Sequence, residues 1–183
     1  MIAYAITNPS TLNFQRLGFD LECFSKKADM ILYRDKDNTD YATCANNFLH
    51  EAKKFSFDKI LLHADYRLAM KLGADGVHLT SSQFHDIAVA KELGLFVIIS
   101  THTFDEVEKA ESLGADMVTF SPIFSTPNKG KPKGVELLNS LVSQYTIPII
   151  ALGGIVTTEH IALCEKSGAK GFASIRYFSK KDK

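Results

Sequence analysis

Short apolar runs recur along the chain, and amphipathic stretches separate them. The runs are rich in β-branched and aromatic residues and are nearly continuous in apolarity, as expected for strands that are buried on both faces of a parallel sheet. The pattern predicts strands at Ile2–Ile6, Met30–Tyr33, Lys59–His63, Gly76–Leu79, Phe96–Ser100, Met117–Ser121, Pro148–Leu152 and Gly171–Ile175.

The stretches between these runs have the period of helices. From Phe104 to Leu113 the apolar residues recur at every third position, and Asp105 and Glu106 near the start suit a helix N-terminus. The same pattern predicts helices over Gln83–Leu93, Val135–Tyr145 and Thr158–Ser167.

A Gly-Ala pair precedes several predicted strands, beginning at Gly73, Gly114 and Gly168. Each glycine follows the last turn of a predicted helix, where a residue in the left-handed conformation ends a helix at little cost. We interpret the three copies as helix-to-strand junctions rather than as ligand-binding motifs.

Eight strands that alternate with helices predict an α/β fold, a small (β/α)8 TIM barrel in a single domain over residues 1–183. This fold usually takes about 250 residues, so the chain is short for it. After the last predicted strand, the segment from Arg176 to Lys183 leaves room only for a truncated final helix. An open doubly wound sheet is the alternative, but the number of strands favours the barrel.

Composition narrows the classes of function. Apolar residues make up 45% and charged residues 23% of the chain, and 21 basic residues balance 21 acidic ones, so bulk charge does not indicate a nucleic-acid partner. No apolar run approaches the roughly 20 residues of a membrane span, and the first residues lack a basic leader. Cys23, Cys44 and Cys164 are scattered, as is typical of reduced thiols. We expect a cytoplasmic protein with neither a membrane nor a nucleic-acid partner.

The carboxyl ends of the strands form the active-site face of such a barrel. Gly153 and Gly154 follow the seventh predicted strand, just before a helix that Thr157 opens. Glycines permit close approach of a ligand, and N–H groups at the start of a helix suit a phosphate. Arg176, at the end of the eighth strand, would add a fixed positive charge. A tight turn without a ligand is the alternative.

Two further groups of basic residues lie at this face. The loop over residues 121–134 contains three prolines and three lysines, and its length is typical of a loop that is either functional or disordered. Lys129 could clamp a phosphorylated substrate. Arg34 and Lys36 alternate with Asp35 after the second strand, so both could face the mouth of the barrel; ion pairs with Asp35 or Asp37 are the equally weighted alternative.

The histidines allow several interpretations. His102 lies just past the fifth strand, where a general acid or base would lie, although a structural cap is the alternative. His78 lies inside a strand and is expected to be a hydrogen-bonded interior residue. His63, Asp65 and His78 have no recognised metal-ligand spacing, so no metal site is assigned to them.

The chain resembles the thiamine phosphate synthase and thiazole tautomerase family. The matching pieces, in order, are YAITN, RDK, GADGVHL, STHTFDEVEKAESLGAD, SPIFSTPNKGKPKG and IPIIALGGI. The resemblance implies a homodimeric (β/α)8 barrel in thiamine biosynthesis. Synthases of the family couple a pyrimidine diphosphate to a thiazole phosphate with Mg²⁺, whereas the tautomerases act on thiazole phosphate without a metal.

The resemblance also implies roles for residues at matching positions. Together with the positions at the strand ends, it assigns catalytic roles to Lys129, Ser100 and His102. Substrate or phosphate contacts are assigned to Arg34, Lys36, Thr126, Gly153, Gly154 and Arg176.

The chain departs from the family where metal would bind. Synthases have aspartates at the positions of Ala64 and Gln83, and neither residue here can supply a carboxylate. Leu32 replaces a glutamine, Arg176 replaces a serine, and Pro122 stands at the position of the tautomerase histidine. No metal ligand is therefore assigned, and Mg²⁺ could enter only through the phosphates of a substrate.

These observations favour a barrel that binds a phosphorylated thiazole or a related small phosphate ligand. Its enzymatic activity is left open, because synthase-like transferase activity is doubtful without the aspartates. The alternatives are a tautomerase-like isomerase, with His102 or His63 as its base, and a catalytically inactive paralogue that binds a phosphorylated small molecule.

Overall fold

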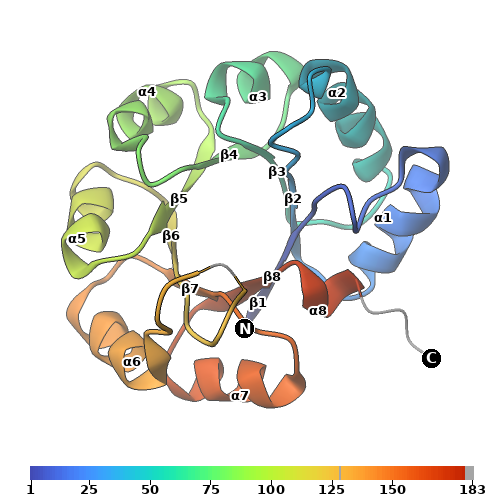
Figure 1. Cartoon of the computed structure of the whole chain (residues 1–183). Coiled ribbons are helices and arrows are strands. Elements are labelled where there is room, and N and C mark those ends of the chain that lie inside the picture. Colours follow the sequence, from blue (N-terminus) through green and yellow to red (C-terminus); the bar gives the residue numbers. More distant parts are fainter. Residues whose placement is uncertain (128, 180–183) are drawn as a thin grey trace.

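A computed structural model describes residues 1–127 and 129–179 (Figure 1). Parallel strands form a closed barrel in chain order, and the last strand pairs with the first. This confirms the predicted barrel and excludes the open sheet. The predicted strand bounds agree with the structure to within one residue. The strands are β1 (Ile2–Ile6), β2 (Met30–Tyr33), β3 (Lys59–His63), β4 (Gly76–Leu79), β5 (Phe96–Thr101), β6 (Met117–Phe120), β7 (Ile149–Leu152) and β8 (Gly171–Ser174).

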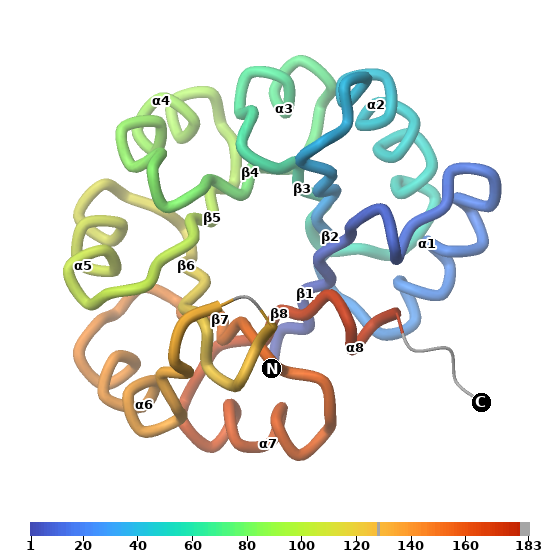
Figure 2. The backbone as a smooth tube through the Cα atoms, in the orientation of Figure 1, coloured from blue at the N-terminus to red at the C-terminus, as the bar shows by residue number. Residues whose placement is uncertain are grey.

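Helices alternate with the strands and surround the barrel (Figures 1 and 2). The backbone carbonyl of Gln83 accepts a hydrogen bond from the backbone N–H of Asp86. This bond closes a tight turn, which divides the helix predicted over Gln83–Leu93 into two short helices. The helix after β8 has a single turn within the described residues, as the truncated final helix requires. The helices are α1 (Leu17–Ser25), α2 (Tyr41–Ala52), α3 (Tyr66–Leu72), α4 (Ile87–Glu92), α5 (Phe104–Ser112), α6 (Gly134–Gln144), α7 (Thr158–Lys166) and α8 (Arg176–Ser179), with short 3₁₀ helices η1 (Phe14–Arg16) and η2 (Phe84–Asp86).

Apolar side chains pack in two layers, one on each side of the sheet. The larger cluster fills the space between the strands and the helices. The second cluster fills the inside of the barrel and consists of Tyr4, Ile6, Met30, Leu32, Leu61, Ile98, Ile150 and Ala173. Because the interior is packed, a ligand can enter only at an end of the barrel.

The repeated glycines end helices, as the sequence predicts. Gly73, Gly114 and Gly168 have φ angles of 67°, 83° and 84°, in the left-handed region that favours glycine. In the structure each one separates a helix from the strand that follows it. The motif therefore serves the fold, and no ligand is needed to explain it.

Carboxylates brace the amino ends of alternate strands. Asp29, Asp75 and Asp116 stand just before β2, β4 and β6, and each accepts a hydrogen bond of 2.7 Å from the backbone N–H of the second residue of the preceding strand. Lys91 also donates to Asp116, at 2.7 Å. The position before β8 is occupied by Lys170, which carries no carboxylate. These three aspartates, which we call the clamp aspartates, thus stabilise the barrel at the end opposite the predicted site.

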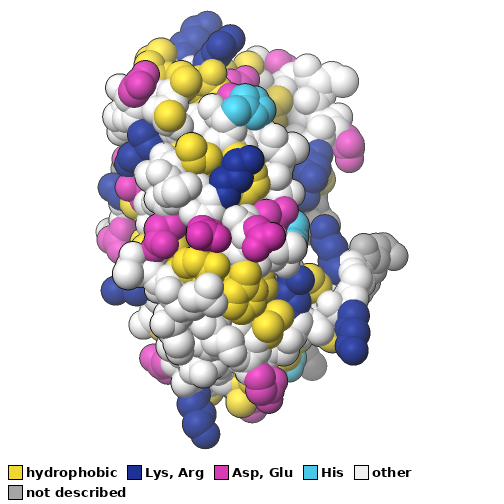
Figure 3. Space-filling view, turned by 90° about the vertical axis from the view of Figure 1, so that its left-hand side faces the viewer, with side chains coloured by type: hydrophobic (Ala, Val, Ile, Leu, Met, Phe, Trp, Pro, Cys, Tyr) yellow, Lys and Arg dark blue, Asp and Glu magenta, His cyan; other side chains and the backbone are white. Residues whose placement is uncertain are grey.

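The face of the molecule drawn in Figure 3 is mixed in charge. On the left-hand side of Figure 1, acidic and basic side chains lie close together among apolar ones (Figure 3). Each helix among the described residues is too short or too polar to cross a membrane.

Candidate active site

A cavity of about 690 Å³ opens at the carboxyl ends of the strands. Its floor is apolar, because Ile6, Leu32, Leu152 and Ala173 from the inside of the barrel form part of it. Polar groups from the strand ends and loops form the rest. All of the residues assigned from the sequence line this one cavity: Arg34, Lys36, Ser100, His102, Thr126, Lys129, Gly153, Gly154 and Arg176.

Three cationic side chains form one group on the cavity wall. Arg34 and Lys129 both lower the pKa of Lys36, with Arg34 the larger cause, so the three positive charges lie within electrostatic reach of one another. Burial lowers the pKa of the Arg34 guanidinium. Within the described part of the chain, neither Arg34 nor Lys36 forms an ion pair with Asp35 or Asp37. The charge of Asp37 raises both pKa values, but it is a smaller cause than those that lower them. Such a concentration of positive charge is suited to an anion.

The Gly153–Gly154 turn supports the loop that follows β6. Both residues have positive φ angles, 100° and 70°. A Cβ atom on Gly153 would lie 2.7 Å from Cα of Pro122, and one on Gly154 would lie 2.6 Å from the carbonyl oxygen of Ser125. The backbone N–H of Phe124 donates to the carbonyl of Gly153 at 3.0 Å. The positive φ angles and the close packing account for both glycines, as the alternative of a tight turn without a ligand requires.

This loop carries two of the assigned residues toward the cavity. It folds over the end of β7 in Figures 1 and 2. Thr126 donates from its hydroxyl to the carbonyl of Phe124 at 2.9 Å, and the N–H of Lys129 donates to the carbonyl of Thr126 at 3.2 Å. These bonds fix the backbone from which the Lys129 side chain extends.

A second part of the cavity wall presents backbone N–H groups. Gly154, Ile175 and Arg176 line the cavity, and within the described residues their backbone N–H groups donate to no other protein group. Ser174 anchors this segment, because its hydroxyl donates to the carbonyl of Ile155 at 2.7 Å and accepts from the N–H of Tyr177 at 3.1 Å. N–H groups without a protein acceptor, next to an arginine, suit an oxyanion.

The inside of the barrel contains a polar chain that the sequence only partly indicates. His78 is buried and hydrogen-bonded, as predicted: its Nδ1 lies 3.0 Å from the Tyr4 hydroxyl and its Nε2 lies 3.1 Å from Oγ of Ser100. Burial, then His63 and Arg34, lower the pKa of His78 to about 3, so its imidazole is neutral. The Tyr4 contact could not be read from the sequence, because it depends on the register of distant strands.

His102 makes structural hydrogen bonds at the end of β5, which agrees with the alternative of a structural cap. Its backbone N–H donates to the Glu106 carboxylate, and its Nδ1 lies 3.0 Å from the carbonyl oxygen of Ser121, so it helps to fix the loop after β6. It also lines the cavity. The ring nitrogen that remains, Nε2, is thus the atom that can face a ligand.

His63 is a second histidine of the cavity. It pairs in register with His78 on the adjacent strand. Burial, then Arg34 and Lys36, lower its pKa to about 4, so it is neutral near pH 7. No cluster of three or more potential metal ligands exists among the residues that the structure describes.

The family model described as "Thiamine monophosphate synthase" matches residues 3–178. The chain belongs to this family. The match includes every residue that has been placed in the cavity.

Named relatives agree with the family assignment. The chain is 33% identical over 180 residues to a protein of Aquifex aeolicus named "Putative thiamine-phosphate synthase 2", and the alignment covers 96% of both chains. It is 34% identical over 125 residues to the thiamine-phosphate synthase of Bacillus licheniformis, which covers 66% of this chain and 55% of that one. The thiamine phosphate pyrophosphorylase of Pyrococcus furiosus has the same fold, with a TM-score of 0.84 at 24% identity over 99% of this chain and 89% of that one.

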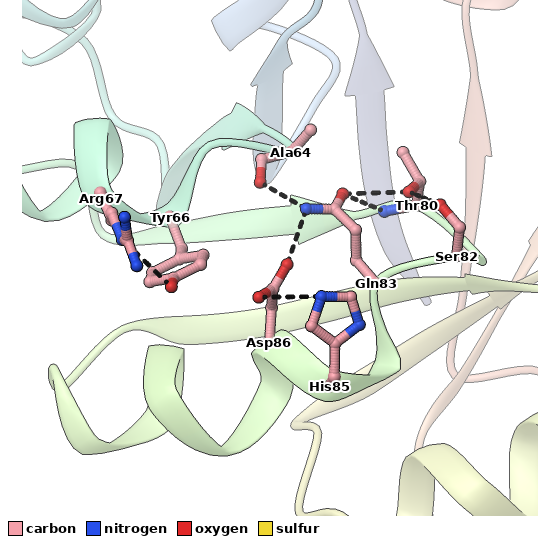
Figure 4. A network of polar contacts seen from close by, with 8 residues as sticks. All are labelled: Ala64, Tyr66, Arg67, Thr80, Ser82, Gln83, His85 and Asp86. Atoms are coloured by element: carbon pink, nitrogen blue, oxygen red, sulfur yellow. Dashed lines mark hydrogen bonds and ion pairs between the residues drawn. The ribbon is translucent and has the colours of Figure 1, made fainter.

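Within this thiamine monophosphate synthase fold, the positions at which the resemblance implies metal-binding aspartates are adjacent. Nε2 of Gln83 donates to the carbonyl oxygen of Ala64 at 3.0 Å and to Asp86 at 3.0 Å, while its Oε1 accepts from Thr80 (Figure 4). A methyl group and an amide engaged in this way do not supply the carboxylates that Mg²⁺ prefers. The residues present therefore do not fit a magnesium ion held by the protein at this point.

Proposed function

We propose that this thiamine monophosphate synthase family member binds a phosphorylated thiazole, or a closely related small phosphate ligand, in the cavity at the mouth of the barrel. The observation that carries the proposal is the convergence of Arg34, Lys36, Lys129 and Arg176 on one cavity. Family membership supports the chemistry of the ligand. The apolar floor suits the ring, and the cationic walls suit the phosphate.

The phosphate group of the ligand is assigned to the wall formed by Gly154, Ile175 and Arg176. Three backbone N–H groups and a guanidinium there can all donate to phosphate oxygens. Arg176 stands where synthases of the family have a serine, so this chain offers a full positive charge in place of a hydroxyl. We expect a phosphate to bind here without a metal ion.

A second candidate function is the transferase reaction itself, and the group formed by Arg34, Lys36 and Lys129 favours it. In that reaction the thiazole nitrogen attacks the methylene carbon of the pyrimidine diphosphate, the carbon–oxygen bond breaks, and diphosphate leaves. The three cations would stabilise the departing charge that a bound metal would otherwise stabilise. Magnesium would enter only if the diphosphate carried it.

Calorimetry with thiazole phosphate tests the first proposal. We expect saturable binding to the full chain, and we expect Arg176→Gln to weaken it by about ten- to a hundredfold, the cost of one charge-assisted hydrogen bond. Arg67→Gln is the matched control, because Arg67 is exposed on α3 and does not line the cavity. Absence of binding by the parent protein would refute the proposal.

An assay with both substrates separates the two functions. Thiazole phosphate and pyrimidine diphosphate are supplied with Mg²⁺ and, in parallel, with a chelator, and thiamine phosphate is measured. Turnover in both conditions supports the cation-assisted transferase. Binding of thiazole phosphate without turnover leaves the ligand-binding function and rejects the transferase.

A further inference from the structure

Three polar side chains meet inside the barrel, beside the apolar side chains that fill most of it. Tyr4 from β1, His78 from β4 and Ser100 from β5 form a chain that crosses the interior. Tyr4 is completely buried and His78 is 3% exposed, whereas Ser100 is partly exposed and lines the cavity. The chain therefore connects the closed interior to the ligand site.

The direction of these hydrogen bonds follows from the burial of Tyr4. Among the described residues, Nδ1 of His78 is the one group that can accept from the Tyr4 hydroxyl, at 3.0 Å. A buried hydroxyl that donates to nothing is costly, and a phenol is a stronger donor than an aliphatic alcohol. Tyr4 therefore donates to Nδ1, and the proton of the neutral imidazole lies on Nε2.

A proton on Nε2 determines what Ser100 can do. Nε2–H donates to Oγ of Ser100 at 3.1 Å, with Oγ1 of Thr119 a more distant second acceptor at 3.5 Å. Ser100 accepts this bond, so its own O–H proton is left to donate elsewhere. Ser100 lines the cavity, and within the described residues its hydroxyl has no hydrogen-bond partner besides His78, so this proton is available to a ligand there.

We propose that Tyr4 and His78 are positioning residues that hold the Ser100 hydroxyl as a hydrogen-bond donor to the ligand. The ligand must then present an acceptor, such as an unprotonated ring nitrogen or a carbonyl oxygen, at the floor of the cavity. This assignment rests on the proposed function, since it states which kind of ring atom a bound heterocycle directs inward. The opposite tautomer would make Ser100 a donor to His78 and would leave only its lone pairs for the ligand.

The tautomer of His78 can be measured without any ligand. In the full chain labelled with ¹⁵N at histidine, we expect the nitrogen shifts and couplings of the Nε2–H form at pH 7. Tyr4→Phe removes the donor to Nδ1 and should shift His78 toward the Nδ1–H form. Tyr33→Phe is the matched control, because Tyr33 is a buried tyrosine of β2 whose hydroxyl contacts Asn38 and not His78; it should leave the spectrum of His78 unchanged.

Two results would overturn the assignment: an Nδ1–H or doubly protonated His78 in the parent protein, or a tautomer that Tyr4→Phe does not change. If Tyr4→Phe does not fold, Ser100→Ala provides an independent measurement, because Ser100 is only partly buried. Loss of the acceptor on Nε2–H should move the Nε2 resonance while the tautomer stays the same. A switch of tautomer in Ser100→Ala would also contradict the proposal.

Affinity for thiazole phosphate tests the consequence. We expect Ser100→Ala and Tyr4→Phe each to weaken binding about tenfold, and the double variant to be no weaker than either one, because both act through one hydrogen bond. Tyr33→Phe should bind as the parent does. Additive losses would show that Tyr4 does not act through Ser100. If the parent does not bind this probe, the proposed function fails, whereas the spectrum of His78 still decides the tautomer.

Discussion

Nε2 of Gln83 lies 3.0 Å from the carbonyl oxygen of Ala64, across the gap between the loops that follow β3 and β4. A single amide thus joins the two loops at which the resemblance implies metal-binding aspartates. Ala64 has a φ angle of 63°, a conformation that Asp and Asn adopt more readily than most residues. The local backbone therefore suits a carboxylate that the sequence does not supply.

Ala64→Asp combined with Gln83→Asp should create affinity for Mg²⁺. The two carboxylates would replace a methyl group and a neutral amide. The carboxylate of Asp86 would lie beside them, because its Oδ2 is 3.0 Å from Nε2 of Gln83. The melting temperature of the double variant should rise with Mg²⁺ concentration, as linkage to a ligand of the folded state requires, whereas that of the parent should not respond in this way. Ala64→Asn with Gln83→Asn is the uncharged control. A double variant that does not respond to Mg²⁺ would show that the two side chains do not face one site.

Much of this architecture could be predicted from the sequence. The strands follow from runs such as that over residues 59–63, which are apolar enough to be buried on both faces, and the helix ends follow from Gly73 and its repeats. The residues around the cavity follow from one rule, that strands of a barrel present their carboxyl ends together. Lys129 and Gly154 could be placed in this way although they are distant in the chain.

The contacts that set the chemistry could not be predicted. The bond between Tyr4 and His78 depends on which interior side chains reach across the barrel. The packing of Gly154 against Ser125 depends on how the loop after β6 folds back. The sequence treats Gln83 as a missing carboxylate, whereas the structure shows a side chain with hydrogen bonds to three residues. Such relations arise from tertiary geometry and leave no periodic signal.

Gly154→Ala should destabilise the protein more than Gly114→Ala. Both glycines have positive φ, so both substitutions carry the conformational cost of about 1–2 kcal/mol. A Cβ on Gly154 also meets the carbonyl of Ser125 at 2.6 Å, which adds about 1–3 kcal/mol, whereas one on Gly114 meets nothing within 4 Å. Urea denaturation measures both. Equal losses would mean that the loop after β6 moves aside without cost.

Lys129→Gln should weaken binding of inorganic pyrophosphate and make the binding less sensitive to salt. Lys129 contributes to the positive potential that lowers the pKa of Lys36, and an anion in the cavity would interact with all three cations of that wall. We expect a loss of about tenfold in affinity, measured by calorimetry at two salt concentrations. Lys131→Gln is the control on the same loop, because Lys131 is exposed and does not line the cavity. Equal effects of the two variants would contradict a specific anion wall.

Stability should fall as the pH falls from 7 to 5. His63 has a folded-state pKa of about 4, below its ordinary value, so the unfolded chain binds more protons in this range. The stabilisation is fully present above the unfolded-state pKa of about 6.5 and is lost as the pH approaches the folded-state pKa of about 4. For His63 alone, the free energy of unfolding should fall by about 2 kcal/mol between pH 7 and 5. Urea denaturation at each pH should show a weaker pH dependence for His63→Gln. His50→Gln, at an exposed position of α2, should keep the dependence of the parent.

Asp75→Ala should lower the free energy of unfolding by about 1–2 kcal/mol without changing ligand affinity. The substitution removes the charged acceptor of the Ile60 N–H at the end of the barrel opposite the cavity. Asp58→Ala is the control, because its side chain is exposed and forms no hydrogen bond to another described residue. Chemical denaturation and calorimetry with thiazole phosphate test the two parts separately. A loss of affinity in Asp75→Ala would connect the two ends of the barrel and contradict this expectation.

The clamp aspartates also divide the barrel into pairs of strands. Each clamp lies within a unit of strand, helix and strand, and joins β1 to the residue before β2, β3 to the residue before β4, and β5 to the residue before β6. Chain breaks between units leave every clamp within one fragment, whereas breaks inside a unit separate an aspartate from its strand. New termini placed between β2 and β3, or between β4 and β5, should therefore be tolerated better than those between β3 and β4. The strand–helix–strand units β1–β2, β3–β4 and β5–β6 are thus each closed internally by one aspartate, whereas the unit β7–β8 has Lys170 at that position.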